Sequence, residues 1–240
     1  MIITRGVIKR FGRRTVLDGL DAEIATGRIT ALVGPNGAGK TTFLKVLLGL
    51  ARPTSGQVVI DGTILDGSPA YRAAIGYMPQ IVHFPAHLRG TDLVAMVTAL
   101  RGGTALPDLS LADAFELGET MARPLGELSG GTRQKINAVL AFAFAPKLLI
   151  LDEPTAGLDP LAARVLKDRI LAERARGTTV LITSHVLPEL EELADDVLFL
   201  VEGKTAWAGA VKALTHGTGE RTLERAVARL LGGGVRLAVA

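Results

Sequence analysis

The octapeptide GPNGAGKT at residues 34–41 constrains the fold of this chain more than any other feature of its sequence. It is a complete G-x-x-x-x-G-K-[ST] motif, a loop whose backbone wraps around phosphate groups. An apolar segment ending at Val33 leads into it, and apolar residues at helical spacing follow from Phe43 to Leu48. The motif requires this order of strand, loop and helix, so the sequence predicts an α/β fold with a parallel sheet.

Each part of this loop has a physical role in binding phosphate. The glycines let the backbone approach closely, and the backbone N–H groups and the following helix N-terminus supply positive potential. Lys40 is predicted to hold the β- and γ-phosphates as a point charge, and Thr41 to bind Mg²⁺ through its hydroxyl. The alternative is a glycine-rich turn without a ligand, which the flanking strand and helix disfavour. The predicted phosphate-binding residues are Gly34, Pro35, Asn36, Gly37, Ala38, Gly39, Lys40, Thr41 and Thr42.

Strands and helices alternate again in the second half of the chain. Residues 148–151 form a continuous apolar run, typical of a strand buried on both faces. Asp159, followed by proline, is a strong helix start. Between about 80 and 140 the periodicity is helical, with one helix predicted from Ser110 to Leu117. We therefore interpret the chain as one domain with three parts: an α/β core (about 1–79 and 141–208), a helical lobe (about 80–140) and a C-terminal extension (about 209–240).

Composition excludes several classes of protein. The 240 residues include no cysteine, which excludes disulfide scaffolds, thiolate metal sites and cysteine nucleophiles. The formal net charge is +3, which gives no reason to expect direct binding of nucleic acid. A membrane-spanning helix needs about 20 apolar residues in a row. The most apolar region, residues 136–151, is interrupted by Asn137 and Lys147, so we expect no membrane-spanning segment in this chain.

Two adjacent acids, Asp152 and Glu153, follow the apolar run of residues 148–151. Open α/β sheets bind their ligands at the carboxyl ends of the strands. Asp152 is therefore predicted to hold Mg²⁺, directly or through water, and Glu153 to polarise the attacking water in phosphoryl transfer. For this pair taken alone, a solvated turn is the alternative.

The segment LSGGT at residues 128–132 precedes a helix that is expected to begin near Arg133. Ser129 is an ordinary N-cap residue, and two glycines form an ordinary loop. The same serine hydroxyl and the amides of a helix N-terminus could also bind the γ-phosphate of a nucleotide. By itself, the segment leaves both interpretations open.

In their order along the chain, these segments resemble the motifs of the ATP-binding subunits of ABC transporters. The resemblance covers nearly the whole chain: a Walker A motif (Gly34 to Thr42), a Q-loop glutamine (Gln80), the ABC signature (Leu128 to Thr132), a Walker B motif with its catalytic glutamate (Leu148 to Glu153), a D-loop (Gly157 to Asp159), a switch histidine (His185) and an aromatic residue at the adenine position (Phe11). Thr132 departs from the usual glutamine of the signature. Because the serine and glycines remain, we expect the γ-phosphate contact to be kept.

The resemblance implies a P-loop NTPase core of the RecA type, with a mostly parallel sheet, an antiparallel β subdomain and an inserted helical subdomain. It implies ATP and Mg²⁺ as cofactors and ATP hydrolysis as the reaction. The catalytic residues would be Glu153, His185 and Gln80, the metal ligands Thr41, Gln80 and Asp152, and the further nucleotide contacts Phe11, Ser129, Gly130, Gly131 and Asp159. Taken singly, Gln80 could be an ordinary loop residue, His185 an ordinary hydrogen-bonding histidine and Phe11 a core residue.

The resemblance also implies partners. Two ATP molecules would be sandwiched between two subunits in a head-to-tail homodimer, and a separate transmembrane permease subunit would dock near residues 80–89. The chain would then lie in the cytoplasm, on the inner face of the cell membrane. Residues 222–225 resemble ATPases of the ABC-2 exporter class. Residues 128–135 and 190–195 resemble the ATPase of the copper-maturation exporter for nitrous-oxide reductase.

Two other functions stay open at this point. One is a soluble ABC ATPase that acts on nucleic acid or ribosomes. Such proteins usually carry paired cassettes, a long coiled-coil insertion or strongly basic segments, and the sequence shows none of these. The other is a regulatory subunit that holds nucleotide without hydrolysing it, which the presence of both Glu153 and His185 argues against.

Overall fold

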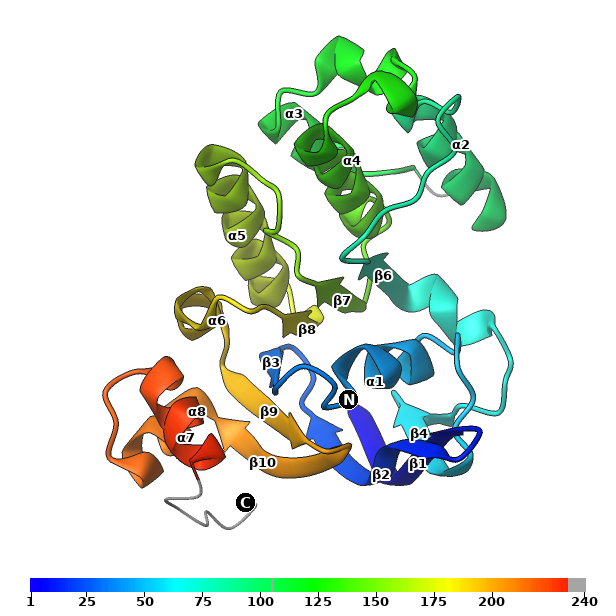
Figure 1. Cartoon of the computed structure of the whole chain (residues 1–240). Helices are drawn as coiled ribbons and strands as arrows, with labels where there is room; N and C mark the ends of the chain where they lie inside the picture. Colours follow the sequence, from blue (N-terminus) through cyan, green and yellow to red (C-terminus); the bar gives the residue numbers. More distant parts are fainter. Residues whose placement is uncertain (105, 233–240) are drawn as a thin grey trace. The chain divides into compact units, whose positions relative to one another are not determined.

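The computed structural model describes residues 1–104 and 106–232. Within this range the chain forms two compact units: residues 1–72 with the described residues from Thr179 onward, and residues 73–178. Figure 1 labels the elements of both units. The predicted boundaries of the core, helical lobe and C-terminal extension stay a prediction. The last part of that extension, residues 233–240, lies outside the described residues.

The first unit contains an antiparallel sheet in the order β2-β1-β4-β5. Its strands are β1 (Ile2–Phe11), β2 (Arg14–Ile24), β4 (Ser55–Ile60) and β5 (Thr63–Ile64). Asp61 and Gly62 join β4 to β5 with φ angles of 47° and 78°, as a tight two-residue hairpin turn requires. This sheet is the antiparallel β subdomain that the resemblance implies.

The first unit also contains a mostly parallel group of strands. β3 (Ile29–Val33) is parallel to both of its neighbours, β8 (Thr179–Thr183) and β9 (Asp196–Val201), and β10 (Lys204–Ala210) is antiparallel to β9. Every residue of β3 and β8 is buried, which explains sequences that contain only apolar residues and threonine. The helices of this unit are α1 (Lys40–Leu47), α6 (Leu187–Leu193), α7 (Val211–Thr218) and α8 (Leu223–Leu231).

The second unit combines two parallel strands with helices. The strands are β6 (Ile75–Met78) and β7 (Leu148–Asp152), and the helices are α2 (Gly90–Leu100), α3 (Ser110–Ala114), α4 (Gly130–Phe142) and α5 (Pro160–Ala175). The described residues also form three short 3-10 helices: η1 (Ala70–Ala74), at the junction of the two units, and η2 (Gly118–Ala122) and η3 (Leu125–Glu127) in the second unit. The predicted α/β class is thus confirmed, with parallel pairing in both units.

Two predicted helix bounds were wrong. α4 begins at Gly130 rather than near Arg133, because Ser129 caps it: Ser129 Oγ accepts a hydrogen bond of 3.1 Å from the backbone N–H of Thr132. The helix predicted from Ser110 to Leu117 ends at Ala114. Glu116 has a φ angle of 54°, a left-handed conformation that an α-helix cannot contain.

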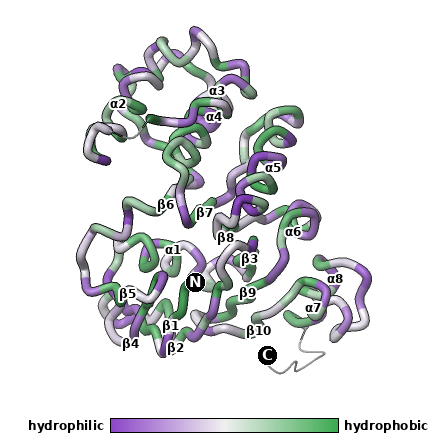
Figure 2. Tube along the Cα trace, turned by 180° about the vertical axis from the view of Figure 1, so that it is seen from behind, coloured by the Kyte–Doolittle hydropathy of each residue, from purple (hydrophilic) through white to green (hydrophobic). Residues whose placement is uncertain are grey.

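The predicted helix after Asp159 is confirmed as α5. Asp159 is its N-cap and accepts a hydrogen bond of 2.8 Å from the N–H of Ala162. Hydrophobic and hydrophilic residues alternate along α5 in Figure 2, as one buried face predicts. In the described part of the chain, none of the helices is long and apolar enough to cross a membrane.

Candidate functional site

The phosphate loop follows β3 in the first unit and has no room for side chains at two of its glycines. At Gly34, with a φ angle of 156°, a Cβ atom would lie 2.3 Å from the carbonyl oxygen of Leu200. At Gly39, with a φ angle of 103°, it would lie 2.8 Å from Cδ2 of Leu17 and 3.0 Å from the carbonyl oxygen of Val16. Backbone packing against β9 and β2 therefore requires glycine at both ends of the loop.

Lys40 folds back over this loop. Its Nζ donates hydrogen bonds to the carbonyl oxygens of Gly34, at 2.5 Å, and of Pro35, at 3.2 Å. The N-cap of α1 is Gly39, which has no side chain to cover the first N–H groups of the helix. The first helical residues, Lys40 to Thr42, include no acid. The loop therefore combines a cation with a positive helix end, the two features that bind phosphate.

His185 lies at the same sheet edge as this loop. β3 and β8 are parallel, with Ala31 opposite Ile182. The segments that follow the two strands, from Gly34 and from Ser184, therefore leave the sheet at one edge. Ser184 is buried and its Oγ accepts a 3.0 Å hydrogen bond from the N–H of Val186, while His185 is exposed. This geometry is what a γ-phosphate contact would need, and the role of His185 stays a prediction.

Phe11 is not a core residue. It ends β1 and is 53% exposed, and Nζ of Lys9 lies 4.8 Å from the centre of its ring. The hairpin that begins with Phe11 continues in β2 to Val16 and Leu17, which pack against Gly39. An exposed ring on this hairpin is compatible with stacking on adenine, and that role stays a prediction.

In the second unit, β6 and β7 bring a further group of predicted residues to one edge. The strands are parallel, with Met78 opposite Leu151, so Gln80 and the acidic pair both follow strands that end on the same side. Asp152 and Glu153 are each 8% exposed, which excludes the solvated turn that the sequence left open. Burial first, and then the charge of Asp152, raise the pKa of Tyr77 in β6.

Glu153 has a strained backbone. Its φ angle is 52°, in the left-handed region where a residue with a side chain is uncommon. Such conformations cost of the order of 1–3 kcal/mol and cluster at active sites. Because Glu153 is also buried at the end of a parallel strand, its position fits the predicted role in aligning water.

The LSGGT segment is packed against the D-loop. A Cβ atom on Gly131 would lie 2.8 Å from the carbonyl oxygen of Gly157. Nζ of Lys135 lies 3.0 Å from Oδ2 of Asp159. The pKa of Asp159 is lowered, first by the hydrogen bond from the N–H of Ala162 and then by Lys135. The signature and the D-loop are therefore one surface cluster within this unit.

Ser129 is the N-cap of α4, which is the structural one of the two interpretations left open for the LSGGT segment. Its Oγ accepts from the N–H of Thr132 and lies 2.8 Å from Oγ1 of the same residue. Thr132, the departure from the usual signature, thus takes part in the cap. Ser129 and Gly130 are exposed, so the second interpretation, an anion contact from outside, stays a prediction.

The predicted metal ligands have suitable chemistry for Mg²⁺. Among residues 1–104 and 106–232, no group of three or more His, Asp or Glu could hold a metal ion by itself. Mg²⁺ is commonly bound by one or two protein oxygens together with phosphates and water. The hydroxyl of Thr41, the carboxylate of Asp152 and the amide oxygen of Gln80 are hard oxygen donors of this kind.

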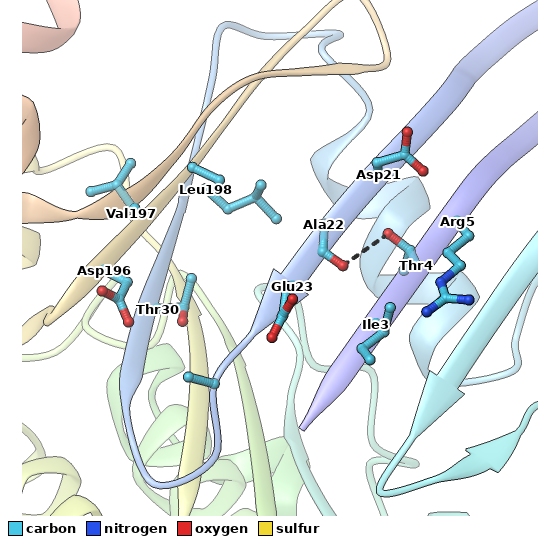
Figure 3. Close-up of a pocket in the computed structure, with 13 residues that line it drawn as sticks. Ile3, Thr4, Arg5, Asp21, Ala22, Glu23, Thr30, Asp196, Val197 and Leu198 are labelled. Atoms are coloured by element: carbon cyan, nitrogen blue, oxygen red, sulfur yellow. Dashed lines mark hydrogen bonds between the residues drawn. The ribbon is translucent and has the colours of Figure 1, made fainter. Parts of the chain in front are cut away.

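A separate groove in the first unit contains none of the predicted site residues. Figure 3 shows its lining residues on strands β1, β2, β3 and β9. The groove has a volume of about 570 Å³. Asp21, Glu23 and Asp196 contribute carboxylates to its lining and Arg5 contributes a guanidinium, while Asp196 is paired with Arg28 through a 2.8 Å hydrogen bond to its Oδ1. Even with Arg28 counted, carboxylates outnumber guanidinium groups here, so the groove is less suited to a triphosphate than the phosphate loop is.

Comparison with known proteins decides the family. Residues 17–156, more than half of the chain, match the model of the ABC transporter family. The chain belongs to the ABC transporter family. As a member, it binds and hydrolyses ATP.

Relatives in the ABC transporter family align along most of the chain. The lantibiotic transport ATP-binding protein SrtF of Streptococcus pyogenes is 36% identical, covering 85% of this chain and 88% of SrtF. The Nod factor export ATP-binding protein I of Burkholderia orbicola (strain AU 1054) is 35% identical, covering 88% of this chain and 71% of that protein.

Solved structures of ABC cassettes share the fold. One ATP-binding subunit of an ABC transporter has a TM-score of 0.89 at 28% identity, covering 96% of this chain and 99% of that one. The cassette MJ0796, in a dimeric post-hydrolysis state with ADP and Pi, has a TM-score of 0.78 at 23% identity, covering 88% and 99%. The P-loop NTPase fold predicted from the sequence is thereby confirmed.

Sequence reasoning missed several residues that build the site of this ABC cassette. Lys135, Asn137 and Gly76 hold predicted site segments in place through tertiary contacts. Two polar residues one turn apart, Gln134 and Asn137, on the apolar face of a helix were the one available signal for Asn137. Gly76 and Lys135 carry no local signal, because their partners lie far away in the sequence.

Proposed function

We propose that this chain is the ATPase subunit of an ABC exporter, in which two copies clamp two ATP molecules and drive a separate transmembrane permease. One observation carries the proposal: the same chain has a phosphate loop, a buried acidic pair at a strand end and an exposed signature loop at a helix N-terminus. The names of the relatives, lantibiotic transport and Nod factor export, support the export of a substrate.

The predicted residues have complementary roles in this proposal. Lys40 and the N–H groups of the loop hold the β- and γ-phosphates, and Phe11 stacks on adenine. Thr41, Asp152 and Gln80 hold Mg²⁺, which neutralises charge on the phosphates when bound. Glu153 accepts a hydrogen bond from the attacking water and orients it, while His185 contacts the γ-phosphate. Phosphoryl transfer depends mainly on such positioning and charge stabilisation.

The cluster of the exposed residues Ser129, Gly130 and Asp159 with the half-buried Gly131 is proposed to complete the site of a second copy. Its exposure leaves backbone N–H groups of the α4 N-terminus accessible to a partner's γ-phosphate. A dimeric cassette of the same fold is known, which supports this arrangement. Loss of the γ-phosphate after hydrolysis would remove these contacts and weaken the dimer.

The permease is proposed to dock at a groove in the second unit. The groove has a volume of about 470 Å³ and is lined by Val82, His83, Phe84, Pro85, Ala86, Leu125, Gly126 and Arg133. Its walls are joined by hydrogen bonds of 2.8 Å from the N–H groups of Leu125 and Gly126 to the carbonyl oxygens of Leu88 and Ala86. Docking here would place the chain on the inner face of the cell membrane.

A finer proposal concerns the substrate. The resemblance of residues 128–135 and 190–195 supports an exporter of the copper-maturation type for nitrous-oxide reductase. With no cysteine, this chain would energise such a system rather than bind copper. The test is nitrous-oxide reductase activity and its copper content in cells that carry Glu153→Gln in this chain. Unchanged copper loading would contradict the finer proposal and leave the exporter proposal standing.

Co-purification tests the proposed function as a whole. The tagged Glu153→Gln variant, loaded with MgATP, is expected to sediment with membranes together with one integral membrane protein, and Lys40→Ala to do so less. The soluble alternative would be supported instead if the variant were recovered with ribosomes or nucleic acid, stayed bound to them through a salt wash, and brought down no membrane protein.

A further inference from the structure

Asn137 connects α4 to the segment that carries Gln80. It is 3% exposed, and its Nδ2 donates a hydrogen bond of 3.1 Å to the carbonyl oxygen of Pro79. The same nitrogen lies 3.4 Å from Oε1 of Gln134, one turn earlier in the helix. Both neighbours are acceptors, so each of the two amide hydrogens of Asn137 has a partner.

The bond to Pro79 constrains the residue that follows. The carbonyl group of Pro79 and the N–H group of Gln80 belong to one planar peptide unit. A bond that holds this carbonyl oxygen therefore sets the direction in which the chain enters Gln80. Since Gln80 is exposed, packing around its side chain cannot orient it, and the backbone must do so.

A second contact locks the same helix face against β6. Ala141 lies one turn after Asn137, and its carbonyl oxygen would be 2.1 Å from a Cβ atom on Gly76. With backbone contact at Gly76 and a hydrogen bond at Pro79, α4 cannot shift along β6 without breaking one of them. Helix and strand are therefore expected to move as one body.

The buried amides are an unfavourable way to pack a helix. Gln134 is 6% exposed, and within the described residues its Nε2 has no hydrogen-bond partner. An unpaired buried donor costs free energy that an apolar side chain at the same place would avoid. The pair is therefore better explained by the orientation of Pro79 than by stability.

We infer that Asn137 is a positioning residue that aims Gln80 through the Pro79–Gln80 peptide and couples it to Ser129 at the N-terminus of α4. Ser129 lies eight residues before Asn137, about 12 Å along the helix. The inference rests on the proposed roles of Gln80 and Ser129. In the proposed head-to-tail dimer, Gln80 and Ser129 of one copy contact different ATP molecules. The helix α4 would then link these two ATP molecules as a rigid body.

A double-mutant cycle on the full chain tests this inference. Steady-state kcat and KM for MgATP are measured for the wild type, Asn137→Leu, Gln80→Ala and the double variant. Asn137→Leu keeps the number and branching of the side-chain heavy atoms and removes the donor. We expect it to lower kcat by about tenfold and to change KM by less than about twofold, since the phosphate loop is untouched. In the Gln80→Ala background it should lower kcat by less than about twofold.

Two further variants keep the result interpretable. Asn137→Ser, whose hydroxyl is too short to reach Pro79, should reproduce the kcat loss if the leucine variant does not fold. Thr178→Val removes another buried hydrogen bond of the same unit, the 3.1 Å bond to Oε2 of Glu173, and should keep kcat within about twofold of the wild type. It controls for a general loss of stability.

The outcomes distinguish a failure of the positioning role of Asn137 from a failure of the proposed function. Asn137 variants with wild-type kcat, or with the same loss of kcat in both backgrounds, would overturn the positioning role. A wild-type chain without ATPase activity would overturn the proposed function and this inference with it.

Discussion

The carbonyl oxygen of Gly157 lies 2.8 Å from the point that a Cβ atom would occupy on Gly131. Real Cβ atoms do not approach a backbone oxygen so closely, so the first turn of α4 and the D-loop fit only because position 131 is glycine. Gly130, the preceding residue, has open space at the corresponding point. The two neighbouring glycines therefore have different structural reasons to be present.

We predict that Gly131→Ala lowers the free energy of unfolding by about 1–2 kcal/mol, because the D-loop must shift to admit the methyl group. Helix propensity alone would predict a gain of up to about 1 kcal/mol from the same change. Gly130→Ala is the matched control and should leave stability unchanged or slightly raised. Urea unfolding monitored by circular dichroism measures both, and equal stability of the two variants would contradict the packing argument.

Glu153→Gln should abolish turnover without abolishing ATP binding. Removing a general base typically costs 10²–10⁴-fold in rate, and glutamine keeps the size of the side chain at this strained position. We expect an ATP-bound dimer to accumulate, visible as a doubled mass in size-exclusion chromatography with MgATP. Lys40→Ala, which removes the charge over the loop, should lose ATP binding or turnover and stay monomeric. Equal ATPase activity in all three proteins would reject both assigned roles.

The phosphate loop and its flanking elements could be predicted because their requirements are local. A positive φ angle at Gly39, a strand before the loop and a helix after it leave a signature within some 20 residues of sequence. The same holds for α5, whose N-cap Asp159 and following proline mark its start. The burial of Asp152 and Glu153 follows from the apolar run that precedes them.

Contacts between distant segments could not be predicted in this way. Asn137 and Pro79 are 58 positions apart, and their hydrogen bond depends on the register of α4 against β6. The close approach of Gly131 to Gly157 likewise follows from tertiary packing. The predicted start of α4 near Arg133 is three residues late, because two adjacent glycines are typical of a loop, whereas here they form the first turn after the N-cap Ser129.

Acid should destabilise the second unit partly through Asp108. Hydrogen bonds from Ser110 and then from Arg169, at 2.7 Å, hold the pKa of Asp108 well below its usual range. A carboxyl whose folded pKa is depressed adds stability above its unfolded pKa of about 3.9, and this stability is lost as pH falls through the folded value. We expect Asp108→Asn to lower the unfolding free energy at pH 7 by under about 1 kcal/mol, since Asp108 is partly exposed.

The measurement for Asp108 is the urea midpoint at pH 7 and at pH 3. The difference between the two midpoints should be smaller in Asp108→Asn than in the wild type, because the variant has lost one acid-sensitive group. Asp113→Asn, a change at an exposed carboxylate of the neighbouring α3, is the control. Identical pH dependence in Asp108→Asn and the wild type would refute the contribution of the Arg169 contact.

Replacing His83, Phe84 and Pro85 by alanine should separate membrane recruitment from catalysis. These side chains line the proposed docking groove, while the backbone hydrogen bonds that hold its wall, to the carbonyl oxygens of Ala86 and Leu88, involve none of the replaced residues. Because a few buried contacts carry most of the energy of an interface, we expect sedimentation with native membranes to fall at least about fivefold. ATPase activity of the isolated chain should stay within about twofold of the wild type.

Leu231→Ala is the control, because it removes an exposed apolar side chain of the other unit, and it should change neither membrane sedimentation nor ATPase activity. A triple variant that still sediments with membranes would mean that the permease binds elsewhere, since its apolar contact at the groove would be gone.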